Sequence, residues 1–172
     1  EGQAAVSLRW AGTLRRLLGT SDPDRIRDPD PAVVRRVVPL ARLLFRYFRG
    51  EVHGLEHIPP GPALLVANHN AGITFISPFL FGLAWHERTG GRDPVHALAH
   101  DVMVTLPGVG PLLQGCGAVR ARRDTADRIL EAGRKILVTP GGNWEAYRPW
   151  RERNRVDFGG RAGFMRTALR HG

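Results

Sequence analysis

Short apolar segments of strand length alternate with segments of helical periodicity from about residue 50 to the end of the 172-residue chain. Such alternation requires a sheet whose faces are covered by helices, because each helix has one apolar face to bury. We therefore predict an α/β domain with a mixed sheet flanked by helices. The predicted strands are 51–58, 62–67, 95–99, 118–120 and 135–139, and the predicted helices are 73–87, 124–131 and 162–170.

The first 49 residues form a different region. Residues 4–18 and 32–48 have the periodicity of amphipathic helices, and residues 21–31 between them contain three Asp-Pro pairs, which favour a linker. Arginine alternates with Leu, Val and Phe in 32–48, a pattern typical either of an interfacial membrane helix or of a core-packed helix with a solvated basic face. We predict N-terminal amphipathic helices and a linker over 1–49. We expect a core over 50–172 that is truncated at its C-terminal end, since the chain stops on an unfinished helical pattern.

Charge and composition restrict the partners. The formal net charge is +9, and Lys135 is the only lysine, so the positive charge is almost entirely arginine. This balance implies an anionic partner: nucleic acid, an anionic membrane surface or a phosphorylated ligand. A single cysteine, Cys116, excludes an internal disulfide and a thiolate zinc site, and it indicates a reducing compartment. The longest apolar run, 72–85, is shorter than the ~20 residues that span a bilayer.

Asn68-His69 is the sharpest candidate for chemistry. The pair follows a predicted buried strand and precedes a predicted helix, where a rigid sheet edge meets an open loop. A histidine at this position can take a proton from a hydroxyl near neutral pH, or it can simply bond to the backbone.

Other patterns are less specific. His96, His100 and Asp101 lack the spacing of a metal site, so we expect no metal. Trp144, Tyr147 and Trp150 alternate with arginines that include Arg148, Arg151, Arg153 and Arg155. This second pattern suits either stacking and phosphate contacts to RNA or a bilayer interface.

Three segments carry a family resemblance. Residues 63–72 (ALLVANHNAG), 117–149 (GAVRARRDTADRILEAGRKILVTPGGNWEAYRP) and 155–169 (RVDFGGRAGFMRTAL) resemble the lysophospholipid and glycerol-phosphate acyltransferase superfamily. The most similar branch is that of bacterial and diacylglycerol-acyltransferase-like proteins with Pro-Gly-Gly in place of Pro-Glu-Gly. The resemblance covers roughly residues 48–172, with the motifs in the family's order and spacing.

The resemblance implies transfer of a fatty acyl group from a thioester, acyl-CoA or acyl carrier protein, to the hydroxyl of a glycerolipid or lysophospholipid. It places His69 on the family's catalytic general base, with Asn68 before it. It implies no metal, no cofactor beyond the thioester co-substrate and no covalent intermediate. The superfamily carries an Asp five or eight residues after the histidine, and here those positions are Thr74 and Ser77.

The missing Asp leaves several outcomes open. Thr74 or Ser77 can hold the imidazole by a hydrogen bond but cannot stabilise its charged form as a carboxylate does. Asp101 and Glu145 are candidate substitute acids. The alternatives are an enzyme of reduced activity and a lipid-binding pseudoenzyme of the same fold.

The resemblance also assigns binding residues. Gly117 begins a motif whose arginine, six residues later at Arg123, binds the acceptor's phosphate in many branches. Arg120 and Arg122 beside it complete either a phosphate clamp or a solvated basic turn. The residues Pro140, Gly141 and Gly142 correspond to a turn that binds the acceptor or stabilises the oxyanion, with Glu145 in place of the acid absent at 141.

The leading prediction is therefore an O-acyltransferase bound peripherally to anionic lipids at the cytoplasmic face of a membrane. No nucleic acid is expected, although a basic nucleic-acid-binding module remains the alternative from another class. That alternative explains the charge but not why Asn-His and Pro-Gly-Gly each follow a buried strand.

Overall fold

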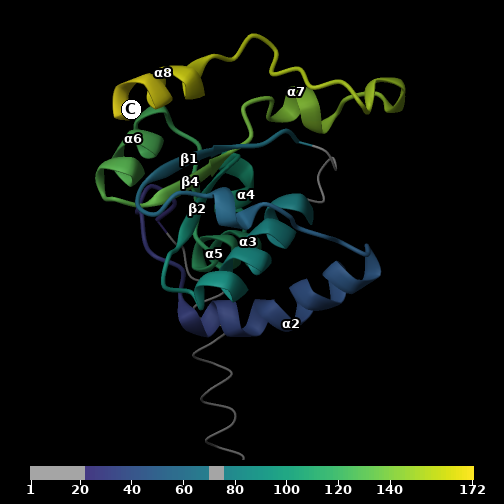
Figure 1. Cartoon of the computed structure of the whole chain (residues 1–172), viewed down its shortest axis with the longest axis vertical. Coiled ribbons are helices and arrows are strands. Elements are labelled where there is room, and N and C mark those ends of the chain that lie inside the picture. The colour runs from purple at the N-terminus through teal and green to yellow at the C-terminus, as the bar shows by residue number, and fades with distance from the viewer. Residues whose placement is uncertain (1–21, 70–75) are drawn as a thin grey trace, which may run out of the picture.

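A computed structural model describes residues 22–69 and 76–172 (Figure 1). Its centre is a four-stranded sheet in the order β1-β4-β2-β3. The strands are β1 (Ala63–Val66), β2 (Val95–Ala99), β3 (Ala118–Arg120) and β4 (Lys135–Val138). The three strand pairs are all parallel. The predicted α/β class is confirmed, and the part of the sheet that is described contains no antiparallel pair.

Helices cover both faces of this sheet. Figure 1 shows α6 and α8 on one side, and α3 with α2 beyond it on the other. The helices are α2 (Pro31–Tyr47), α3 (Ile76–Thr89), α4 (Asp101–Thr105), α5 (Val109–Gly115), α6 (Arg123–Glu131), α7 (Asn143–Ala146) and α8 (Gly163–His171), with 3-10 turns η1 (Leu55–His57) and η3 (Trp150–Glu152). None of the helices in 22–69 and 76–172 has the length and apolarity needed to cross a bilayer.

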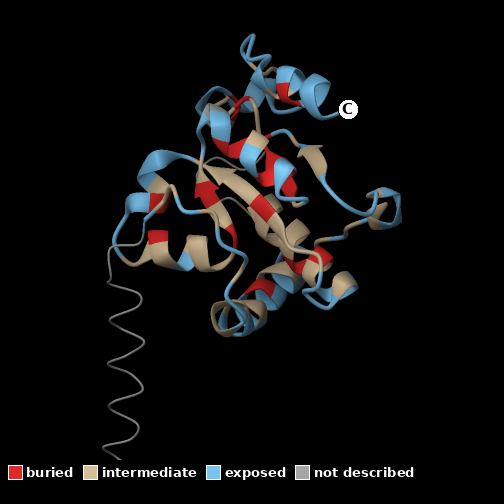
Figure 2. Ribbon diagram, turned by 90° about the vertical axis from the view of Figure 1, so that its left-hand side faces the viewer, coloured by how far each residue is buried: buried red, intermediate tan, exposed pale blue. Residues whose placement is uncertain are grey.

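The core lies between the sheet and α6. Val119, Ile136 and Val138 of the strands pack with Ile129 of α6, and Phe164 of α8 covers the cluster. Figure 2 shows the buried residues concentrated on the strands and on the helix surfaces that face them. Strands buried on both faces need near-continuous apolar runs, which is the composition of β4 after its first residue.

Lys135 begins β4 with a fully buried side chain. Its Nζ donates to the Gly61 carbonyl oxygen at 2.6 Å and to Asp93 Oδ2 at 2.7 Å, and lies 5.6 Å from the Trp85 ring centroid. A buried ammonium is tolerated only with such partners. The chain's one lysine therefore ties the amino end of β4 to the neighbouring loops.

Two sequence predictions of local structure are wrong. Residues 51–58 form no strand, because Gly54 adopts a left-handed conformation (φ 79°) that starts the turn η1. Residues 106–117, which are rich in Pro and Gly and lie outside every predicted helix and strand, contain helix α5. Pro111 lies in its first turn, where a helix needs no backbone donor. Gly110 and Gly115 permit close contact with the Val104 carbonyl oxygen and with Val33. The predicted helix 4–18 lies outside the described residues.

Candidate functional site

The register of β1 and β4 creates the site. Val66 pairs with Val138, and the Ala67 backbone N–H donates to the Val138 carbonyl oxygen at 2.9 Å. Because the two strands are parallel neighbours, the segments that follow them leave the same edge of the sheet side by side. Asn68-His69 thus emerges beside Pro140-Gly141-Gly142, and the two strongest motifs of the sequence are brought together.

His69 is buried, with 8% of its surface exposed, yet it lines a large cavity. Burial lowers the pKa of His69 below its usual value of 6.5, while the carboxylate of Glu145 acts in the opposite direction. The net direction is downward, so His69 is neutral at pH 7. A neutral imidazole is the form that can accept a proton.

Two side chains from the segment after the double glycine hold the His69 backbone. Glu145 Oε2 accepts a 2.9 Å hydrogen bond from the His69 N–H, and Arg148 Nη2 donates to the His69 carbonyl oxygen at 2.9 Å. Glu145 is 3% exposed. Glu145 Oε1 and Arg148 Nη1 are buried without a hydrogen-bond partner among the described residues. The segment 145–148 therefore fixes both the N–H and the carbonyl group of His69. It also leaves one buried carboxylate oxygen and one buried guanidinium nitrogen available beside the histidine backbone.

Gly141 has a specific reason to be glycine. A Cβ at this position would lie 2.1 Å from Glu145 Cγ and 2.4 Å from Glu145 Oε2. No side chain at 141 fits while Glu145 points inward. The Glu145 carboxylate thus fills the space next to residue 141, and its role in place of the acid of a Pro-Glu-Gly turn stays a prediction.

The cavity beside His69 is large and mainly apolar. It has a volume of about 1190 Å³, above the range of roughly 300–1,000 Å³ typical of small-molecule sites. Val38 and Ala41 of α2 and Phe79, Gly82 and Leu83 of α3 are among its lining residues. Such a lining suits a long hydrocarbon ligand.

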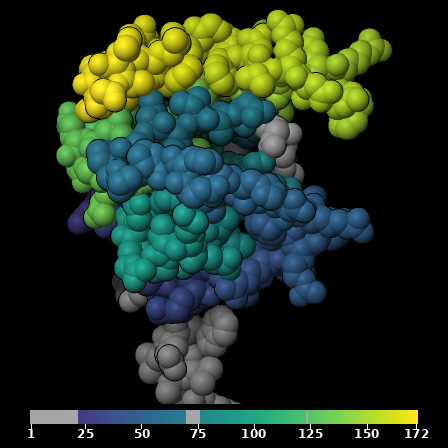
Figure 3. All heavy atoms as spheres, viewed as in Figure 1, coloured from purple at the N-terminus to yellow at the C-terminus, as the bar shows by residue number. Residues whose placement is uncertain are grey.

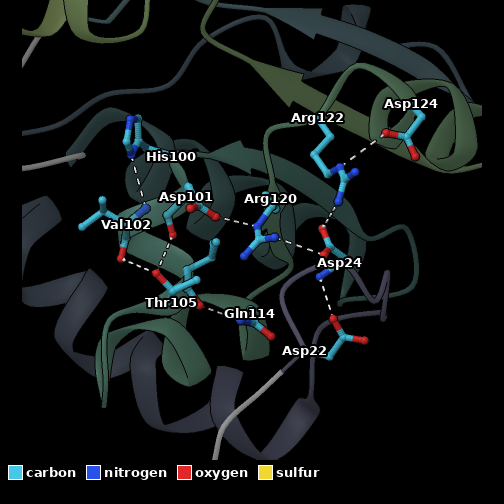
Figure 4. A network of polar contacts seen from close by, with 11 residues as sticks. Asp22, Asp24, His100, Asp101, Val102, Thr105, Gln114, Arg120, Arg122 and Asp124 are labelled. Carbon is cyan, nitrogen blue, oxygen red and sulfur yellow. Dashed lines mark hydrogen bonds and ion pairs between the residues drawn. The ribbon is translucent and has the colours of Figure 1, made fainter.

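The predicted arginine clamp is already occupied by carboxylates (Figure 4). Arg120 pairs with Asp101 at 2.6 Å and with Asp24 at 3.1 Å. Arg122 pairs with Asp24 at 3.2 Å and approaches Asp124 at 3.8 Å. Arg120 ends β3, which is three strand spacings from β1, or about 14 Å at ~4.8 Å per strand. These two arginines lie away from His69, and the side chain of Arg123 is not described.

The remaining predicted residues are dispersed. Ser77 lies in the first turn of α3, and Thr74 lies outside the described residues. Gly117 precedes β3 at the opposite end of the strands, where its Cβ position is 3.1 Å from both Pro29 and the Val95 carbonyl oxygen, a packing reason for glycine. Its contact with substrate stays a prediction, as do the roles of Ser77 and Thr74. Asp101, the other candidate acid, is paired with Arg120 rather than with His69.

The residues weighed for a metal also separate. His100 Nδ1 accepts from the Val102 N–H at the start of α4. His96 is fully buried in β2, 3.7 Å from Asp28. No group of three metal-ligating side chains occurs within 22–69 and 76–172.

Two arginines of the site were not identified from the sequence. The sequence pattern places Arg148 among arginines suited to RNA or a bilayer interface, whereas its guanidinium donates to the His69 carbonyl oxygen. Its spacing of three from Glu145, one helical turn, is the signal that places both on one face. Arg161 donates to the carbonyl oxygens of Pro140 and Gly141 and so holds the double-glycine turn.

These features define a class: an α/β protein in which a histidine, held by a buried carboxylate at the carboxyl ends of adjacent parallel strands, lines an apolar cavity. The chain matches the Acyltransferase family over residues 49–172. It belongs to that family, and the resemblance stated from its motifs is confirmed.

Curated relatives agree with this assignment. An uncharacterized protein of Mycobacterium tuberculosis (strain ATCC 25618 / H37Rv) is 36% identical over 166 residues, covering 93% of this chain and 45% of its own length. The "DGAT1/2-independent enzyme synthesizing storage lipids" of Bos taurus is 32% identical over 120 residues, covering 69% of this chain and 34% of its own. The human protein of that name is 32% identical, with 36% of its length covered. The chain thus spans less than half of these relatives. No solved structure matches it significantly.

Proposed function

We propose that this chain is the core of an enzyme that transfers a fatty acyl group from a thioester to the hydroxyl of a glycerolipid. The observation that carries the proposal is His69, whose backbone is held by Glu145 and Arg148 and which lines an apolar cavity. Membership of the Acyltransferase family and similarity to enzymes named for storage-lipid synthesis support a lipid substrate. The donor is acyl-CoA or acyl carrier protein.

His69 acts as general base. Its imidazole takes the proton of the acceptor hydroxyl as that oxygen attacks the thioester carbonyl carbon. The new C–O bond forms, the C–S bond breaks, and the proton passes from the imidazolium to the leaving thiolate. A positioned base of this kind contributes typically about 10²–10⁴-fold. Glu145 stabilises the transient imidazolium, and the step needs no metal.

The apolar cavity receives the acyl chain. Its walls from α2 and α3 include Phe79, Leu83 and Trp85 of the apolar run 72–85, and His69 lies on the same cavity. The thioester carbon is then next to the imidazole while the hydrocarbon extends along the helices. The enzyme works as a peripheral protein at the cytoplasmic face of a membrane, from which its substrates are drawn.

The acceptor is a neutral glycerolipid rather than a phosphorylated one. Arg120 and Arg122 are neutralised by Asp24, Asp101 and Asp124. A phosphate would have to displace these carboxylates before it gained either arginine. A monoacyl- or diacylglycerol makes no such demand.

The alternative is a pseudoenzyme that binds lipid without turnover. It depends on Thr74 and Ser77, which leave His69 without the usual aspartate. Glu145 favours the enzyme, because it supplies a buried carboxylate to the same histidine from another segment.

The test is thioester turnover. Purified full-length protein is mixed with acyl-CoA or acyl carrier protein and with monoacylglycerol, diacylglycerol or lysophosphatidate, and thiol release is measured. We expect release with the neutral acceptors, its loss in His69→Ala, and its retention in His53→Ala, which alters an exposed histidine outside the site. Turnover that survives His69→Ala would remove this histidine from the mechanism. If the wild-type protein shows no turnover with any donor, the pseudoenzyme is favoured.

A further inference from the structure

Helix α2 exposes an apolar stripe. Leu40, Leu43 and Tyr47 are each more than half exposed and recur at the spacing of one helix face. We call these three residues the helix stripe. Val38 and Ala41, on another face of α2, line the cavity that contains His69. The helix therefore has apolar residues both toward the cavity and toward solvent.

The segment 144–150, which holds His69, also has side chains that point inward and others that are exposed. Glu145 and Arg148 point inward to the histidine backbone. Trp144, Tyr147 and Trp150 alternate with them and are each more than half exposed. We call these three aromatic residues the aromatic strip.

Both surfaces extend to one edge of the molecule. In Figure 1 the C-terminal end of α2 and the segment that follows α7 both reach the right-hand side. Figure 3 shows the two projecting on that side, one above the other. Tyr147 lines the cavity as well. The aromatic strip and α2 therefore each contribute a wall residue to the same cavity as well as an exposed apolar surface.

Positive charge accompanies both surfaces. Exposed Arg46 and Arg49 lie at the end of α2. The guanidinium of Arg153 lies 4.5 Å from the centroid of the Trp150 ring. The strip's other neighbours are Arg151, Glu152 and Arg155, the last paired with Asp157. Aromatic rings and arginine stems with a cationic excess suit the headgroup region of an anionic bilayer.

We propose that an anionic lipid bilayer binds this edge through the helix stripe and the aromatic strip together. This proposal rests on the proposed function and specifies which face meets the lipid. The bilayer contacts the outer side of the same turn whose inner side holds His69. The acyl cavity then opens toward the membrane.

Vesicle flotation tests the proposal without any need for turnover. Full-length protein is floated with phosphatidylcholine vesicles and with vesicles that also contain phosphatidylglycerol. We expect stronger binding to the second set. The variants Leu43→Gln/Tyr47→Gln and Trp144→Gln/Trp150→Gln should each lower the partition coefficient at least about tenfold, since each removes two large side chains from the interface.

The matched control is Leu169→Gln. Leu169 is also highly exposed, and its helix α8 lies on the left-hand side in Figure 1, away from the edge described above. It should float like the wild type, and thermal melts should show that all variants remain folded. The proposal is overturned if the wild type does not float, if it binds both vesicle sets equally, or if the control loses as much binding as the paired variants.

A water-soluble assay separates this proposal from the proposed function. With short-chain acyl-CoA and a soluble glycerol ester, the paired variants should retain turnover while losing flotation. An inactive protein that still floats through these residues would defeat the proposed function alone. An active protein whose variants float normally would defeat the bilayer proposal alone.

Discussion

The change Glu145→Gln tests the site most directly. Glutamine has almost the same shape as glutamate and keeps an oxygen that can accept from the His69 N–H, a bond of 2.9 Å in the wild type. The change therefore removes the negative charge and little else. At a position that is 3% exposed, solvent cannot replace that charge.

The size of the effect follows from that bond. A hydrogen bond to a charged group contributes about 1.5–3 kcal/mol and a neutral one about 0.5–1.5 kcal/mol. The unfolding free energy should thus fall by roughly 1–1.5 kcal/mol. Turnover should fall roughly five- to tenfold, since the imidazolium that forms in the transition state loses a stabilisation of similar size.

The pH profile supplies the distinctive result. Glu145 raises the pKa of His69 against the larger lowering caused by burial. Without the carboxylate the pKa of His69 falls further, so the acidic limb of kcat/KM should move to lower pH even as the rate falls. The assay is thiol release measured from about pH 5 to pH 8.

Stability should be measured at neutral or slightly alkaline pH. Burial lowers the pKa values of His69 and His96 below 6.5. Below that value the unfolded chain binds protons that the folded chain does not bind, so stability falls as pH falls.

If the acidic limb of kcat/KM stays fixed or moves to higher pH in Glu145→Gln, electrostatic coupling between residue 145 and His69 is refuted, whatever happens to the rate.

Two further substitutions probe the neighbouring geometry. Gly141→Ala should lower the unfolding free energy of the wild type by roughly 2 kcal/mol or more, because the new methyl group collides with Glu145. The same change should lower it much less in a Glu145→Ala background. If the two changes lower stability additively in thermal melts, this contact is excluded. Gly82 lines the cavity with open space at its Cβ position, so Gly82→Phe should shift the preferred acyl chain to shorter lengths. Gly82→Ala should leave the preferred length nearly unchanged and stabilise helix α3 by up to about 1 kcal/mol. An unaltered chain-length profile in the Phe variant would place the acyl chain elsewhere.

Much of the framework was predictable because short-range patterns determine it. The boundaries of β2 and β3 follow from the sequence. Those of β4 and α6 differ from prediction by one residue at one end, and those of β1 and α8 by one residue at each end. The adjacency of His69 to the double glycine was predicted only through the family resemblance. It arises physically from the β1–β4 pairing, which joins residues about seventy positions apart.

What the sequence did not reveal depends on side-chain direction. In the sequence, Arg148 cannot be distinguished from the exposed arginines that follow it, and only the fold shows that it donates to the His69 carbonyl oxygen. The arginines near β3 have the composition of a clamp, and only the fold brings Asp24 against them from the linker before α2. Long-range ion pairs leave no periodic signal, so composition alone could not identify them.

The contact between Gly141 and Glu145 restricts how this site can change over evolutionary time. A side chain at 141 and an inward glutamate at 145 exclude each other. A lineage that moves its acid from one position to the other must pass through an ancestor with a small residue at both, in which the histidine has no acidic neighbour from this segment. Descendants should therefore retain one arrangement or the other, and intermediate sequences should be rare.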